Sequence, residues 1–151
     1  MENNNQDSKS LFEQIGGREA IDRVMKTFYD LVYKDPWIGK YFEKIDQKHI
    51  EAQQGDFTQG FLGGGHIYCG ALPIPAHKHM FITEELFDLR TSLLKKALIQ
   101  EKIPDHVIDK WIAVDSAFRG AMVKKSVNDC QKRFYTDEII GFDKNGNKIA
   151  A

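Results

Sequence analysis

The chain has 151 residues, enough for one hydrophobic core but not for two. Its hydrophobic fraction of 42%, charged fraction of 28% and formal net charge of −1 are ordinary for a globular protein and give no reason to expect nucleic acid or membrane as a partner. No apolar run approaches the roughly 20 residues of a membrane helix. The polar first ten residues lack a signal-peptide core, and the isolated Cys69 and Cys130 suit a reducing compartment. We therefore expect a cytoplasmic protein.

The first expected helix is short. Ser10 and Glu13 have the spacing of a capping box, in which each side chain can bind a free amide of the first turn. The pair Gly16-Gly17 disfavours helix and permits a sharp turn, so the helix should end there. Residues 1–10 are expected to form a disordered N-terminal extension.

Two longer helices should follow. Apolar residues between Arg18 and Tyr33 recur at three- and four-residue intervals, which predicts an amphipathic helix that ends at Asp35-Pro36. Residues 37–45 form an aromatic connector. Asp46 can cap the next helix, and the glycines at 63–65 end it.

The stretch from Gly65 to Ile82 has no helical period, and its glycines and prolines predict a loop with at most one turn around His77. Thr83 can cap another helix, and Pro104 can sit in the first turn of a last long one. No long stretch alternates with period two, which favours an all-α fold.

The tail from Gln131 to Ala151 is less regular. Its segment 143–147 is similar to the opening of a calcium loop, but the glycine is misplaced and a bidentate glutamate is missing at position 12. We predict instead a turn that joins two short extended segments. The expected organisation is a folded domain over residues 11–130 followed by a C-terminal extension over residues 131–151.

Two polar residues lie where apolar residues are expected. Gln54 follows Ile50 by four residues and precedes Phe57 by three, so its carboxamide should face the interior. Tyr29 lies on the apolar face of its helix, and its hydroxyl needs a partner. The two side chains could bind one another or a backbone carbonyl, or they could form a ligand site.

Asp115 raises the same question in the last helix, where Arg119 one turn later offers a structural partner. His77 lies in a constrained loop. Histidine is the usual protein ligand of haem iron in oxygen-binding proteins, although a lone loop histidine is more often a surface residue. A zinc site that includes His77 and His79 would need three or four ligands, and no other histidine or cysteine has supporting spacing.

Taken together, these residues resemble the truncated haemoglobins, most closely group I, from about Leu11 to Lys125. The ordered set of motifs carries the resemblance, since each motif alone is weak. In chain order the motifs are Gly16-Gly17, Phe28-Tyr29, Phe42, Gln54, Leu62-Gly63-Gly64, Tyr68-Cys69-Gly70, His77, Ile82-Thr83 and Phe87.

The resemblance implies an all-α truncated globin fold, a two-on-two helical sandwich around haem b. His77 would be the proximal ligand of the iron, Phe42 would pack flat on the haem, and Phe87 would lie against its proximal face. The positions that often carry a basic residue for a haem propionate are not basic here, which leaves Lys48 and Lys78 as candidates.

On the distal side, the resemblance makes Tyr29 and Gln54 the hydrogen-bond donors to the bound ligand. Ile50 would line this side, where many globins place a histidine. Phe57 matches a residue that borders the apolar ligand tunnel of group I.

The function implied is reversible O₂ binding at ferrous iron, with CO and NO as further ligands, and either NO dioxygenation or ligand sensing. NO dioxygenation would need a separate reductase, because the chain carries no nucleotide-binding motif. The alternative is a haem-free globin-like sensor or interaction module. That alternative does not require Tyr29, Gln54 and His77 to converge.

Overall fold

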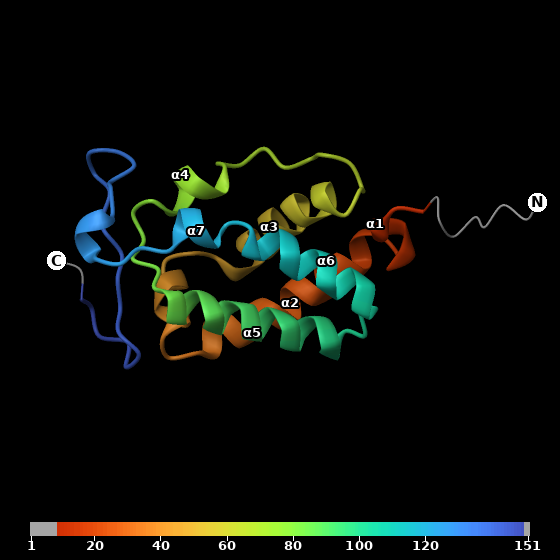
Figure 1. Cartoon of the computed structure of the whole chain (residues 1–151), viewed down its shortest axis with the longest axis horizontal. Helices are drawn as coiled ribbons and strands as arrows, with labels where there is room; N and C mark the ends of the chain where they lie inside the picture. Colours follow the sequence, from red (N-terminus) through yellow and green to blue (C-terminus); the bar gives the residue numbers. More distant parts are fainter. Residues whose placement is uncertain (1–8, 150–151) are drawn as a thin grey trace, which may run out of the picture.

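A computed structural model of the protein describes residues 9–149 and is mostly helical (Figure 1). In chain order the helices are α1 (Leu11–Gln14), α2 (Arg18–Lys34), the 3₁₀ helix η1 (Ile38–Phe42), α3 (Gln47–Phe61), α4 (Pro73–His77), α5 (Glu84–Gln100), α6 (Asp105–Ser116), α7 (Arg119–Met122) and the 3₁₀ helix η2 (Val127–Asp129). Within residues 9–149 the β structure is limited to three isolated bridges. The predicted all-α fold class is confirmed.

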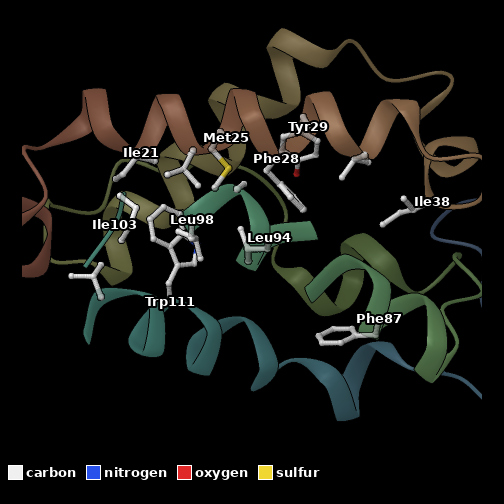
Figure 2. Close-up of a cluster of buried hydrophobic side chains, with 14 of the residues drawn as sticks. Ile21, Met25, Phe28, Tyr29, Ile38, Phe87, Leu94, Leu98, Ile103 and Trp111 are labelled. Carbon is white, nitrogen blue, oxygen red and sulfur yellow. The ribbon is translucent and has the colours of Figure 1, made fainter. Parts of the chain in front are cut away.

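The long helices form two packed pairs. Helix α2 packs against α3, α5 packs against α6, and α2 also contacts α5, so the core lies between the pairs (Figure 1). Gly16 and Gly17, with φ angles of 95° and 81°, make the left-handed turn from α1 into α2. The interior face of α2 carries Ile21, Val24, Met25, Phe28, Tyr29 and Val32. Figure 2 shows part of this face opposite Leu94 and Leu98 of α5.

Three predicted helix starts are confirmed by their caps. The side chains of Ser10, Asp46 and Thr83 each accept a hydrogen bond from a backbone amide three residues later. Each cap satisfies an amide that has no partner within its helix. The reciprocal half of the predicted box at Ser10, from the Glu13 side chain, is not among the hydrogen bonds of residues 9–149.

The sequence predicts the structure of the segment before α5 better than that of the segment after it. The loop from Gly65 to Ile82 condenses into the single short helix α4, as predicted. The last long helix, however, is divided, because α6 ends at Ser116 and α7 begins at Arg119. Around this break, amides bond to carbonyls three residues back at 3.1–3.3 Å, as in a tighter 3₁₀ turn. Pro104 also lies at the N-cap of α6, one position before the predicted first turn.

The C-terminal segment, residues 126–149, runs beside the chain that follows α4 (Figure 1). Ile140 forms a bridge with Met80, and its carbonyl accepts a hydrogen bond from the Phe81 amide at 2.7 Å. The predicted turn at 143–147 is confirmed, since Phe142 pairs antiparallel with Lys148 around it. The segment therefore packs against the folded part of the chain.

Most of the expected N-terminal extension lies outside the described residues, which begin at Lys9. Within the described range, no helix is both long and apolar enough to cross a membrane.

Candidate functional site

Tyr29 has its ring inside the fold. Tyr29 is 3% exposed on α2, and its ring lies edge-on to that of Phe28, with the centroids 4.8 Å apart (Figure 2). Its ring also lies edge-on to that of Phe42, at a centroid distance of 5.7 Å. Burial raises the pKa of the Tyr29 phenol well above its ordinary value, so the group remains a neutral O–H donor at physiological pH. Among residues 9–149, no hydrogen bond involves this hydroxyl. It is thus available to a ligand.

Asp115 has a different partner from the one the sequence suggested. Its Oδ1 accepts a hydrogen bond from Arg90 Nη1 of α5 at 2.5 Å. Arg119 instead binds Glu84 and Asp88 near the start of α5. The predicted Asp115–Arg119 pair is therefore wrong, because α6 has ended between the two residues and no longer holds them one turn apart.

The charge of Arg90 influences the pKa values of both Tyr29 and His77. Burial is the main influence on the pKa of Tyr29, but the Arg90 guanidinium acts against it and lowers that pKa. The pKa of His77 is lowered first by burial and further by Arg90. The Arg90 guanidinium also lies over the Phe28 ring, 5.3 Å from its centroid. Arg90 therefore acts electrostatically on both the predicted distal donor and the predicted proximal ligand.

His77 is the last residue of α4, and its Nδ1 lies 2.6 Å from the carbonyl oxygen of Pro73. Because a carbonyl can only accept, Nδ1 must carry the proton, and Nε2 keeps its lone pair. Burial lowers the pKa of His77 and favours the neutral imidazole. A neutral imidazole held through one nitrogen is the usual form of a histidine metal ligand.

His79 has different surroundings. It is 4% exposed, its Nδ1 has no partner within the described residues, and its carbonyl accepts a hydrogen bond from the Ile140 amide. Burial lowers the pKa of His79, and Arg133 lowers it further, whereas Asp137 raises it. His79 thus lies under the C-terminal segment.

The remaining predicted residues occupy the interior or its border. Ile50 and Gln54 of α3 are half-buried, and Ile50 packs against the core. No hydrogen bond of residues 9–149 joins Gln54 to Tyr29. The alternative in which these two side chains bind one another is therefore not seen in this structure. Phe42 contacts Tyr29, and Phe87 is buried with the Arg119 guanidinium 4.5 Å from its ring centroid.

Phe57 is the centre of a separate aromatic cluster. Its ring lies 5.9 Å from Phe61, 5.4 Å from Tyr68 and 6.1 Å from Phe118, measured between centroids. The cluster thus joins α3, the loop before α4 and the break between α6 and α7.

Sequence reasoning missed Arg90, although a signal was present. Arg90 follows Leu86 by four residues and precedes Leu94 by four, which puts a charge inside an apolar helical stripe. The same argument singled out Gln54. Lys124 was also missed, and no local pattern marks it.

The residues fit an iron porphyrin. His77 offers an imidazole lone pair, Phe42, Ile50 and Phe87 offer apolar contacts, and Tyr29 offers a hydroxyl donor that has no partner within residues 9–149. These are the groups by which a globin binds haem and tunes its ligand.

Comparisons with known proteins agree. The bacterial-like globin family matches residues 10–137. A group 1 truncated haemoglobin of Tetrahymena pyriformis is 30% identical over 117 residues, which cover 78% of this chain and 97% of the relative. A group 1 truncated haemoglobin of Mycolicibacterium paratuberculosis is 30% identical over 101 residues, 67% of this chain and 74% of the relative.

Solved structures show the same fold. The crystal structure of the Tetrahymena pyriformis truncated haemoglobin in its Fe(III) form has a TM-score of 0.71 and 30% identity, and the match covers 78% of this chain and all of that one. A group II truncated haemoglobin of Bacillus anthracis shares the fold, with a TM-score of 0.71 and 23% identity. The match covers 77% of this chain and 92% of that one. The chain therefore belongs to the bacterial-like globin family, as a truncated haemoglobin with the two-on-two helical fold, and its cofactor is haem b, whose iron binds gaseous ligands.

Proposed function

We propose that the protein binds O₂ reversibly, with His77 as the proximal ligand of the haem iron and Tyr29 as the main distal donor. The observation that carries the proposal is the hydrogen bond between His77 Nδ1 and the Pro73 carbonyl at 2.6 Å. This bond fixes the tautomer and the orientation of the ring, which leaves Nε2 as the ligand atom. Ferrous haem supplies the open coordination position at which a diatomic gas binds.

The chain's own residues shape the proximal side. Phe87 provides buried apolar surface for this side of a flat macrocycle, whereas Phe42, in contact with Tyr29, packs on the macrocycle toward the distal donor. Lys124 holds the turn after His77 by donating to the carbonyls of His77 and Met80 at 3.1 and 2.7 Å. The proximal imidazole is thus attached to a braced segment, although it belongs to a helix of only five residues.

On the distal side, the Tyr29 hydroxyl donates to the bound gas, with the Gln54 amide alongside. Support comes from the buried, neutral phenol, since a donor removed from water binds a polarised ligand more strongly. Ile50 keeps water from this side. NO and CO have the size and the single donor atom to use the same position.

Two further proposals concern the setting. Cys69 and Cys130 are both unpaired, in keeping with the reducing conditions of the cytoplasm. An iron that oxidises after O₂ binding needs an electron donor, and we propose a separate reductase for this task.

An absorption experiment tests the proposal. Purified protein loaded with haem should show a Soret band, and the ferrous form should change its spectrum on addition of O₂ and recover when O₂ is removed. Immediate and complete oxidation by O₂, without a reversible oxygenated spectrum, would count against O₂ binding while leaving haem binding intact.

A further inference from the structure

We infer that Arg90 adds a charged hydrogen-bond donor to the ligand site of this protein, so that it strengthens the binding of small anions more than that of neutral gases. The inference rests on the haem site proposed above and adds a ligand class to it. The relevant residues are Arg90 on α5, its partner Asp115 on α6, and Tyr29 on α2. Helix α2 packs against α5.

The Arg90–Asp115 pair leaves hydrogen-bonding capacity unused. A guanidinium carries five N–H donors, and within residues 9–149 Arg90 uses one of them, at Nη1. In the same range, Asp115 Oδ2 is buried without a hydrogen-bond partner. Buried polar atoms are rarely left in this state unless a bound group or water completes them. Arg90 can therefore donate to a further group, whereas Asp115 Oδ2 can only accept and needs a donor such as water.

Arg90 packs against the buried core, with its guanidinium 5.3 Å from the centroid of the Phe28 ring. Its side chain keeps 28% of its surface accessible, yet desolvation is the largest influence on its pKa and acts to lower it. Asp115 and Tyr29 act in the opposite direction and hold the pKa of Arg90 above its ordinary value. Arg90 thus holds a positive charge against the Phe28 ring, whose centroid lies 4.8 Å from that of the Tyr29 ring.

A guanidinium beside a neutral phenol favours an anion over a neutral ligand of the same size. Both groups can donate to such a ligand, and the bonds from Arg90 are assisted by charge. Asp115 holds the guanidinium through Oδ1 at a single nitrogen, Nη1, so it leaves the other N–H groups free to donate. A purely structural pair would stabilise the fold but would not make binding depend on ligand charge.

The test uses haem-loaded protein and compares one anion with one neutral ligand. The affinity of the ferric protein for azide and of the ferrous protein for CO would be measured from Soret shifts. The double variant Arg90→Gln/Asp115→Asn removes both charges and keeps similar shapes, and Arg90→Lys keeps the positive charge. Arg23→Gln, on the exposed face of α2, is the matched control for loss of an arginine.

The double variant should bind azide roughly ten- to a hundredfold more weakly, as expected for the loss of one charge-assisted donor, and CO within about twofold of wild type. Arg90→Lys should keep most of the azide affinity, and Arg23→Gln all of it. The infrared C–O stretch of the wild-type CO complex gives a second reading that needs no variant, because a cation beside the ligand lowers this frequency.

Equal azide affinity in wild type and double variant would overturn the role of Arg90. A lower melting temperature with an unchanged azide-to-CO ratio would assign the pair to stability alone. If the double variant does not fold, a wild-type C–O stretch typical of an apolar pocket would overturn the inference by itself. A wild-type protein with no Soret band would overturn the haem site and the inference together, whereas a normal Soret band with charge-independent binding would overturn only the inference.

Discussion

Lys124 Nζ lies 2.7 Å from the carbonyl oxygen of Met80 and 3.1 Å from that of His77, so one ammonium group joins the chain after α7 to both ends of the turn that follows His77, the proposed proximal ligand. The same Nζ donates to the Met122 carbonyl at 3.0 Å. A lysine has three N–H donors, and all three are used here. This arrangement restrains the end of α4 from outside the helix.

Lys124→Met should loosen the His77 segment, since carbonyls that lose a donor are costly when they are partly buried. The cost should be about 1–3 kcal/mol in the free energy of unfolding. Haem should also leave faster, which transfer of haem to an excess of apomyoglobin would measure. Lys125→Met, on the exposed neighbour, is the control. Identical rates of haem loss in the two variants would show that Lys124 does not restrain the His77 segment.

His77→Ala should abolish stable haem retention, because the iron loses its axial bond to the protein. His79→Ala should keep the Soret band. It should lower the melting temperature modestly, since His79 is 4% exposed beneath the C-terminal segment. The absorption spectrum and a thermal melt of each variant separate the two roles. Loss of haem in His79→Ala with retention in His77→Ala would reverse the assignment of the proximal ligand.

Local signals in the sequence predicted much of the fold. Capping residues, paired glycines and proline act within a few residues, which is why the starts at Ser10, Asp46 and Thr83 could be predicted. The break between α6 and α7 has no such signal, because no glycine or proline lies between Ser116 and Arg119. The apolar periodicity of the sequence continues across residues 116–119, although the helix is interrupted there.

The candidate site was predictable in part. Tyr29 and Gln54 interrupt apolar stripes, and that pattern alone marks them. The partner of Asp115 could not be predicted in this way, because Arg90 lies 25 residues away on another helix. Spacing along the sequence identifies neighbours only within one helix, and here it wrongly favoured Arg119 as the partner of Asp115. Pairs between helices depend on how the helices pack.

The pair of Arg133 and Asp137 should make stability depend on pH. Hydrogen bonds from Arg133 hold the pKa of the Asp137 carboxyl well below its ordinary value. Since the folded pKa is depressed, the contribution is complete above the unfolded value of about 4 and is lost as pH falls through the lower folded value. Wild type should exceed Asp137→Asn in the free energy of unfolding by a constant amount above pH ~5, and the difference should shrink in more acid solution. Denaturant unfolding at several pH values would measure it, and a difference that grows on acidification would contradict the sign.

Phe57→Ala should change the entry of ligand more than the equilibrium affinity, if the ring borders an access path. Its contacts with Tyr68 and Phe118 place it where three segments meet, away from the aromatic contacts of Tyr29. Rebinding of CO after flash photolysis would show a changed bimolecular rate. Phe134→Ala, an exposed phenylalanine, is the control. An unchanged association rate with an altered dissociation rate would argue for contact with the bound ligand instead.

Tyr29→Phe gives the sharpest test of the distal site, because it keeps the ring contacts with Phe28 and Phe42 and removes only the hydroxyl. Among residues 9–149 this hydroxyl has no hydrogen-bond partner, so folding and haem binding should survive. Loss of one donor to a polarised ligand, about 1–3 kcal/mol, should raise O₂ dissociation roughly ten- to a hundredfold. CO carries less charge on its oxygen and should respond much less. The iron should also oxidise faster, since O₂ is less firmly held and water enters more easily.

Stopped-flow displacement of O₂ by CO, in wild type and variant, measures the dissociation rates directly. Equal rates would make Tyr29 a core residue that does not touch the ligand, and would leave Gln54 and Arg90 as the donors to examine next.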